Sequence, residues 1–229
     1  MKFNDELCLY ATKPAIKRLR YAIAAYITSI VLSVFVPRKP DMAMGITYFK
    51  RYQMELDLST WHVADEALPA DYRFIRWHED HLEDHAAVKH ASFQNEIDAN
   101  VFPSLAEYES CYRLMQEITR RSNFLADGTW LIAYQPITSE DAEYCGTIQA
   151  LFDSNQRAAV QNLGITPHHR GLKLGTRLLF KALRHFKEMG IQRSMLEVTA
   201  QNVGALRLYK RLGFRIIKTV YKPSTVVHS

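Results

Sequence analysis

Seven short runs rich in apolar, aromatic and β-branched residues predict β-strands, and turn-forming residues separate them. The first run alternates apolar and polar positions, as a strand with one buried face does. The strands are expected at residues 48–58, 72–77, 127–134, 144–152, 158–166, 194–200 and 214–221.

Helical spacing of apolar residues occurs in the segments between the later strands. Residues 172–189 predict a helix that covers one face of a sheet, and Gly190 ends it. Its apolar positions are Leu174, Leu178, Leu179, Ala182, Leu183 and Phe186. Residues 202–213 predict a shorter helix that begins at Asn202 and stops at Gly213.

Two further helices are expected between the second and third strands. The first runs from His78 to about Phe93. The second runs from Ser104 to about Arg121, with Ser104 as its N-cap and Glu107 at the capping-box position three residues later. This order of elements predicts an α/β (α+β mixed) fold, a mixed sheet with helices on both faces.

The length and composition indicate one main domain. A chain of 229 residues with 48% apolar content can bury one substantial core and a small accessory segment. The three cysteines, Cys8, Cys111 and Cys145, are scattered, so they predict neither a disulfide framework nor a zinc site. We expect a reducing, cytoplasmic setting.

The N-terminal part has a composition of its own. Residues 21–36 carry no charge, follow a basic stretch and are shorter than the ~20 apolar residues of a typical membrane span. Three interpretations stay open: a membrane anchor, a helix or strand packed on the domain or on a partner, and a dispensable segment. We expect residues 1–47 to be an extension and residues 48–229 to form the compact domain.

The net charge of +5 hides a division along the chain. Residues 54–110 contain thirteen Asp and Glu against three Lys and Arg, whereas residues 166–222 contain thirteen Lys and Arg against two acids. The C-terminal region therefore suits an anionic ligand and the earlier region a cationic one. No nucleic-acid-binding motif accompanies the basic residues, so nucleic acid is not an expected partner.

Four histidines lie on the predicted helix at residues 78–93, among several acidic residues. His81 and His85 have the i, i+4 spacing that can share a metal ion, but the segment lacks the HExxH pattern. We expect a solvated polar helix face and no metal site.

The stretch "RGLKLG" at residues 170–175 joins an apolar strand to the long helix. The first amides of a helix lack internal partners, so this junction can bind a phosphate group. A tight turn that uses glycines for geometry alone is the alternative. A nucleotide-binding P-loop is excluded because the Gly-Lys-Ser/Thr ending is missing.

Two motifs carry a resemblance to a known family. "LGITPHHRGLKLGTRLL" and "LEVTAQNVGALRLYKRLGF" resemble the acetyl-CoA-binding half of the GNAT acetyltransferase superfamily, the second motif most closely the ribosomal-protein N-acetyltransferases. The clear match covers residues 158–221. The resemblance implies a GNAT-like central mixed, mainly antiparallel sheet and acetyl-CoA as co-substrate.

The resemblance also implies which loop residues bind the cofactor. The backbone amides of residues 172–176 would cradle its pyrophosphate. Lys173 departs from the motif, because a glycine normally stands there. The implied loop residues are Arg170, Gly171, Leu172, Lys173, Leu174, Gly175 and Thr176.

In the GNAT superfamily the strand before this loop diverges from the next strand, and the pantetheine arm bonds to its open edge. Here that edge would comprise Leu163, Gly164 and Ile165. Asn202 would help to hold the arm and Ala205 would leave it room. An N-cap role that needs no cofactor is the alternative for Asn202.

Two residues match catalytic positions of the family. Tyr209 matches the tyrosine that protonates the departing thiolate, and Glu197 matches a base that takes the amine's proton directly or through water. A tyrosine packed in the core and a structural carboxylate are the respective alternatives.

The expected function is direct acetyl transfer from acetyl-CoA to an amine. A protein or peptide α-amine is the leading acceptor, and a small metabolite amine comes next. An α-amine with a pKa of ~7.7–8.0 places less demand on a base than a lysine with a pKa of ~10.4. A non-catalytic acyl-CoA-binding or membrane-tethered module is the alternative from another class, and a homodimer stays open.

Overall fold

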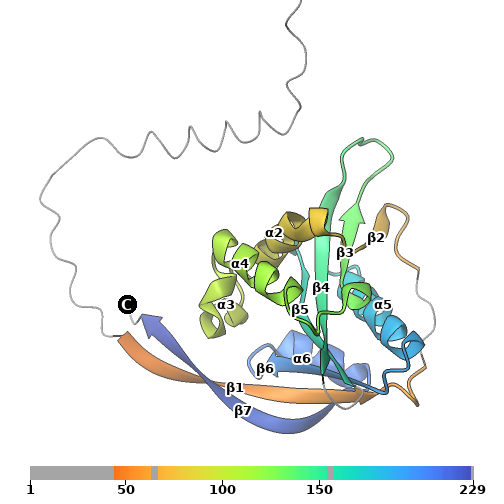
Figure 1. Ribbon diagram of the computed structural model, residues 1–229. Helices are drawn as coiled ribbons and strands as arrows, with labels where there is room; N and C mark the ends of the chain where they lie inside the picture. Colours follow the sequence, from red (N-terminus) through yellow and green to blue (C-terminus); the bar gives the residue numbers. More distant parts are fainter. Residues whose placement is uncertain (1–43, 63–66, 154–156, 228–229) are drawn as a thin grey trace, which may run out of the picture. The chain divides into compact units, whose positions relative to one another are not determined.

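The computed structural model describes residues 44–62, 67–153 and 157–227, which all belong to one compact unit. Seven strands form a single sheet in the order β2-β3-β4-β5-β6-β1-β7 (Figure 1). The strands are β1 (Met44–Asp57), β2 (Tyr72–Arg76), β3 (Trp130–Tyr134), β4 (Glu143–Asp153), β5 (Arg157–Ile165), β6 (Arg193–Thr199) and β7 (Arg215–Val227). Only β5 and β6 run parallel, which confirms the predicted mixed, mainly antiparallel sheet.

Helices cover both faces of this sheet, as predicted (Figure 1). The α-helices of the described chain are α2 (Leu82–Phe93), α3 (Ile97–Val101), α4 (Tyr108–Thr119), α5 (Leu174–Glu188) and α6 (Val203–Arg211). The apolar stripe of α5 packs on one face, with Ile148 and Ala150 of β4 in the same buried cluster. Leu151 points the other way, into a cluster with residues of α2 and α4. Alternate residues of β4 thus serve opposite faces.

Three features of the helical region between β2 and β3 differ from the prediction. The helix expected from His78 begins at Leu82, after a 3-10 turn at Glu79–His81. The helix expected from Ser104 starts at Tyr108, because Pro103, Ser104 and Leu105 form a separate 3-10 turn with Leu105 buried in the core. Glu107 takes the N-cap position without a side-chain bond. The sequence reading also missed α3, because five residues are too few to show a helical period.

Strands β1 and β7 are longer than predicted and pair from Met44 opposite Val227 to Glu55 opposite Arg215. Strand β6 pairs only with the second half of β1. The apolar segment at residues 21–36 lies outside the described residues, and so do its three interpretations. Within the described ranges, no helix has the length and apolar character needed to cross a membrane.

Candidate active site

Strands β5 and β6 lie side by side only at their beginnings. Their ladder joins Arg157–Ala159 to Arg193–Met195 and ends there. On its other side β5 pairs with β4 through a register shift, so that Asn162 and Leu163 together oppose a single residue of β4. Asn162 takes a left-handed backbone conformation, with φ of 49°. Such a bulge bends its strand, and from Val160 onward the edge of β5 that faces β6 is open.

A short exposed loop links the open end of β5 to α5. The amides of His169 and Arg170 bond back to Thr166 and Pro167, which tightens the turn at the strand exit. Gly171 and Lys173 both have positive φ, 83° and 57°. The first turn of α5 carries no acidic residue and no side chain caps it, so its unpaired amides have no competing negative charge beside them.

The Arg170 side chain braces this loop against the helices on the opposite side of β5. Its Nε donates to the Ile165 carbonyl at 3.1 Å, and its Nη2 donates to the Ser92 carbonyl at 3.0 Å. Its Nη1 forms an ion pair with Glu96 at 2.6 Å. Each guanidinium nitrogen thus has a protein acceptor, and Arg170 acts here by fixing the loop to α2 and to the segment before α3.

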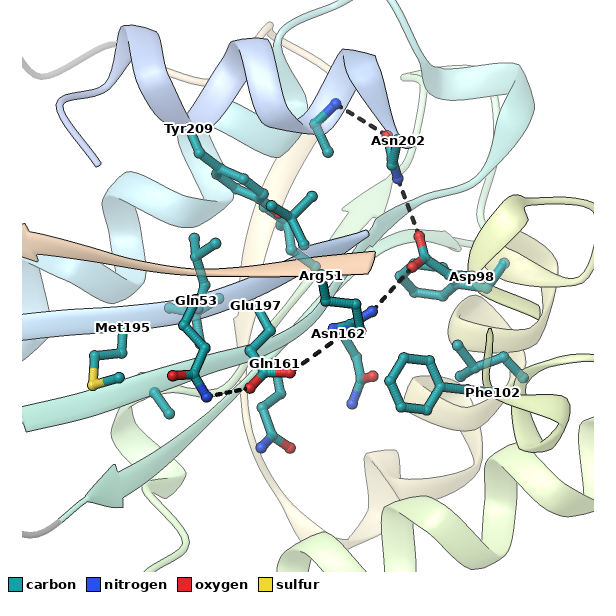
Figure 2. A pocket seen from close by; sticks show the side chains of 18 of the residues that line it. Arg51, Gln53, Asp98, Phe102, Gln161, Asn162, Met195, Glu197, Asn202 and Tyr209 are labelled. Atoms are coloured by element: carbon teal, nitrogen blue, oxygen red, sulfur yellow. Dashed lines mark hydrogen bonds and ion pairs between the residues drawn. The ribbon is translucent and has the colours of Figure 1, made fainter. Parts of the chain in front are cut away.

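A cavity of about 480 Å³ adjoins the split between β5 and β6. Residues of the neighbouring strands β1, β5 and β6 line it, together with residues of α6 and of the segment from α3 to α4. Figure 2 shows side chains from these separate elements converging on one space. Of the residues predicted for the site, the cavity brings together Leu163, Glu197, Asn202, Ala205 and Tyr209.

Glu197 of β6 presents a partly exposed carboxylate to this cavity (Figure 2). The Gln53 Nε2 donates to its Oε1 at 2.8 Å, and the Arg51 Nε donates to its Oε2 at 3.3 Å. Arg51 is almost fully buried, and its guanidinium lies 4.6 Å from the centre of the Phe102 ring. These contacts orient the carboxylate while leaving 42% of the Glu197 side chain open to solvent.

Asp98 of α3 joins the end of β6 to the start of α6 (Figure 2). Thr199 Oγ1 donates to its Oδ1 at 2.7 Å, and Asn202 Nδ2 donates to its Oδ2 at 3.1 Å. The Asn202 Oδ1 accepts the Ala205 amide, so Asn202 is the N-cap of α6. The alternative that the sequence left open for Asn202 is therefore present, and its role toward a cofactor stays a prediction.

Tyr209 of α6 is buried, with 8% of its surface exposed, and its side chain lines the same cavity. Its ring packs edge-on against Phe214. Burial raises the pKa of the Tyr209 phenol above its usual range, and the Asp98 carboxylate adds to this, whereas Arg51 opposes it. The phenol therefore carries its proton at neutral pH, as a proton donor must.

Among the cavity residues that the sequence did not predict are Arg51, Gln53, Asp98 and Phe102. Arg51 and Gln53 are alternate polar residues on one strand, a pattern that is also typical of a solvent face. Their partner Glu197 is more than a hundred positions away in the chain. Nothing local in the sequence signals such a pairing.

The histidine-rich helix α2 is only partly solvated, whereas the sequence predicted a solvated polar face. His85 and Lys89 are fully buried, and His85 bonds to Thr147 on β4. Burial lowers the pKa of His85 well below its usual range and that of Lys89 to about 7. Among the residues that the structure describes, no group of three potential ligands could hold a metal ion.

Comparison with known proteins agrees with this geometry. A family model described as "Acetyltransferase (GNAT) family" matches residues 96–214, which is more than half of the chain. The chain belongs to the GNAT acetyltransferase family. The match spans the split strands, the loop and the cavity residues from Asp98 to Tyr209, so the GNAT part of the sequence resemblance is confirmed.

Curated relatives of this GNAT chain include enzymes named for small molecules. The mycothiol acetyltransferase of Propionibacterium freudenreichii is 24% identical over 170 residues, covering 74% of this chain and 51% of that protein. The streptothricin acetyltransferase of Streptomyces lavendulae is 37% identical over 60 residues, covering 26% of this chain and 32% of that protein. The chain spans about half the length, or less, of these relatives.

A solved structure shares the GNAT fold at low sequence identity. The GCN5-related N-acetyltransferase from Sphaerobacter thermophilus superposes with a TM-score of 0.59 at 15% identity, covering 82% of this chain and 61% of that one. At this identity the likeness concerns the fold alone.

The GNAT cofactor motif explains the backbone at Lys173. This residue occupies the position of the motif's middle glycine, and its φ of 57° and ψ of 17° are left-handed. Glycine adopts this conformation freely, whereas a residue with a Cβ pays roughly 1 kcal/mol. The lysine therefore stands in a backbone conformation that favours glycine.

Proposed function

We propose that this chain transfers an acetyl group from acetyl-CoA directly to the primary amine of a small metabolite. The observation that carries the proposal is the cavity beside the β5–β6 split, which Tyr209 and Glu197 both line. Because the chain spans about half the length of its curated relatives, the activity is proposed for this chain rather than transferred from them.

The described residues fit acetyl-CoA at two places. The unpaired amides at the start of α5 and the basic Lys173 suit its pyrophosphate. At Gly171, no atom lies within 4 Å of the position of a Cβ, so the loop is open to a ligand on that side. The free edge of β5 beyond Ala159 suits the amide-bearing pantetheine arm, which can bond as an added strand.

Tyr209 is proposed as the general acid. Acetyl-CoA supplies a thioester, and cleavage of its carbon–sulfur bond leaves a thiolate that needs a proton. The buried phenol is protonated at neutral pH because ionisation at that depth is unfavourable. The Tyr209 side chain lines the cavity, so its proton can be given to a ligand bound there.

Glu197 is proposed as the acceptor of the proton that the attacking amine loses. Its carboxylate is held by Arg51 and Gln53 and remains partly open to the cavity and to water. Because 42% of the Glu197 side chain is exposed, water reaches this carboxylate from the cavity side. A relay through water to this carboxylate is therefore the proposed route, and it suffices for an amine with a low pKa.

The cavity supports a small, cationic acceptor. Its wall bears three carboxylates, Asp98, Asp153 and Glu197, against the single Arg51, and this balance favours an ammonium group. Gln53, Gln161 and further amide groups add neutral hydrogen-bonding capacity. The relatives named for mycothiol and streptothricin support a metabolite over a protein.

A peptide amino terminus is the second candidate acceptor. The stretch "LEVTAQNVGALRLYKRLGF" supports it through its resemblance to ribosomal-protein N-acetyltransferases. The cavity is chemically compatible with either acceptor, because both present one primary amine.

Acetyl-CoA turnover with a panel of amines tests the proposal. The panel contains amino sugars, amino acids, polyamines and short peptides with free amino termini, and the release of free coenzyme A thiol is measured. Turnover with metabolite amines that falls strongly in Tyr209→Phe supports the proposal. Binding of acetyl-CoA without transfer to any amine would instead favour a non-catalytic module.

We also propose that the acetyltransferase domain covers the range 48–229 expected from the sequence, lengthened to Met44 because β1 begins there and pairs with β7, and that the residues before it are an extension. Supporting evidence is that the family match lies at residues 96–214. Removing residues 1–41 should leave acetyl-CoA binding intact. If residues 21–36 anchor the protein, the same truncation should also shift it from the membrane fraction to the supernatant.

A further inference from the structure

Two carboxylates in the α3 segment reach the two arms of the β5–β6 split. Glu96 pairs with Arg170 in the loop that follows β5. Asp98, two positions later, binds Thr199 at the end of β6 and Asn202 at the start of α6. The segment thus contacts both arms from the open end of the split. Only the second of these arms leads to Tyr209.

Asp98 uses both carboxylate oxygens in fixed contacts. Its Oδ1 accepts from Thr199 and lies 3.6 Å from the Arg51 guanidinium, and its Oδ2 accepts from Asn202. Only 15% of the Asp98 side chain is exposed, and Thr199 and Arg51 are buried. Hydrogen bonds to a carboxylate at such low exposure are stronger and better ordered than surface ones.

The contact with Asn202 determines which way the Asn202 amide points. An Asn side chain has a donor end and an acceptor end. Since Asp98 accepts only, it binds the Nδ2 end and thereby directs Oδ1 to the Ala205 amide, which it caps. Helix α6 has nine residues and depends on such support, because short helices are marginal alone.

We propose that Asp98 is a positioning residue for Tyr209: it fixes the start of α6 and so directs the phenol into the split. The inference rests on the proposed function, in which Tyr209 is the general acid. Tyr209 lies about two helical turns beyond the cap. A change in the tilt of α6 at Asn202 therefore displaces the phenol relative to β5.

Asp98→Asn in a double-mutant cycle with Tyr209→Phe tests this role. The substitution keeps the size of the side chain but leaves one acceptor oxygen for two donors. The Arg51 guanidinium and the Thr199 hydroxyl hold that oxygen on their side, so an NH2 group, which cannot accept from the Asn202 Nδ2, faces Asn202. We expect kcat to fall about tenfold, with the KM for acetyl-CoA changed less than about twofold. In the Tyr209→Phe background, Asp98→Asn should cause almost no further fall, since no phenol remains to be positioned.

Glu109→Gln is the matched control, because Glu109 is an exposed carboxylate on α4 outside the cavity. It removes the same charge and should leave kcat unchanged. If the reductions in kcat caused by Asp98→Asn and Tyr209→Phe are fully additive in free energy, the proposal is overturned. So would an unreduced rate in Tyr209→Phe, since there would then be no acid to position.

Hydrogen exchange at the Ala205 amide provides a readout that does not depend on turnover. Loss of the oriented cap should make this amide exchange about fivefold faster in Asp98→Asn than in the wild type. Equal exchange rates would overturn the proposal even if the enzyme is active. If the wild type turns over no amine, the proposed function fails, and the Ala205 result still decides whether Asp98 fixes the start of α6.

Discussion

The two arms of the β5–β6 split differ in almost every physical respect. The arm after β5 is an exposed loop whose functional groups are backbone amides and whose residues are contiguous. The arm after β6 leads into a buried network of side chains from β1, α3, β6 and α6. The first arrangement suits the binding of a hydrated anion, and the second suits proton transfer away from bulk water.

We therefore expect the arm after β5 to govern the KM for acetyl-CoA and the arm after β6 to govern kcat. Arg170 links the first arm to α2, where the buried Lys89 lies one turn before Ser92, whose carbonyl accepts from Arg170. Stability of the support and chemistry of the site can therefore be perturbed separately.

The largest expected effect concerns this support. Lys89→Met should raise the free energy of unfolding by roughly 4 kcal/mol at pH 7, because the pKa of Lys89 is lowered from its usual 10.5 to about 7. The unfolded chain binds the proton more tightly, so wild-type stability rises between pH 7 and pH 10.5. The destabilisation of the wild type by the buried Lys89 ammonium is fully present below pH 7.

Urea denaturation across this pH range measures the effect. The wild type should gain stability toward high pH, and Lys89→Met should lack that part of the slope. Equal stability of both proteins at pH 7 would contradict the prediction. The KM for acetyl-CoA should stay the same, since the Lys89 Nζ forms no hydrogen bond within the described chain and so holds neither arm in place.

The next effect concerns the second arm. Tyr209→Phe should lower kcat about 100-fold, the typical contribution of a general acid, and leave the KM for acetyl-CoA nearly unchanged. Steady-state kinetics with an active amine measures both constants. A rise in KM at constant kcat would assign Tyr209 to binding and would break the contrast between the arms.

A smaller effect is expected at the ion pair between Glu96 and Arg170, which holds the loop after β5. Glu96→Gln weakens the ion pair with Arg170. The Glu96 side chain is 37% exposed and the Arg170 side chain 44% exposed. The KM for acetyl-CoA should therefore rise only about threefold, because partly exposed ion pairs contribute little. Initial rates at varied acetyl-CoA concentration provide the measurement, and a fall in kcat alone would be the contrary result.

The smallest effect distinguishes two loop residues, Gly171 and Lys173, which both have a positive φ angle. Lys173→Gly should stabilise the fold by about 0.5–1 kcal/mol, because it relieves a left-handed residue that carries a Cβ. Gly171→Ala should destabilise by about 1 kcal/mol, although open space surrounds the new methyl group. Chemical denaturation distinguishes the two signs, and the same sign for both would show that φ is not the cause.

The helices and strands that the sequence predicted well are those with a sustained period. Helix α5 repeats its apolar stripe over four turns, and the structure buries every predicted position of that stripe. Helix α3 and the true start of α4 were missed, because a five-residue helix and a 3-10 turn depend on tertiary contacts. The bond from Asp98 to Asn202 is one such contact.

The candidate site divides in the same way. The loop at residues 170–176 was predictable because its chemistry comes from adjacent amides and glycines. Arg51 and Asp98 were not, because each acquires its role from a partner on another strand or helix. A polar residue on a strand has the same local pattern whether it faces water or a cavity.

The sequence by itself determined the GNAT family and the order of the strands and of the longer helices, and it indicated a loop that we propose for a phosphate, since all three follow from periodicity or from contiguous motifs. Only the tertiary structure decided that the strands part after Ala159 and that Asp98, Arg51 and Glu197 meet beside Tyr209. The physical reason is chain distance: side chains a hundred positions apart interact only after the sheet and α3 have brought their backbones together.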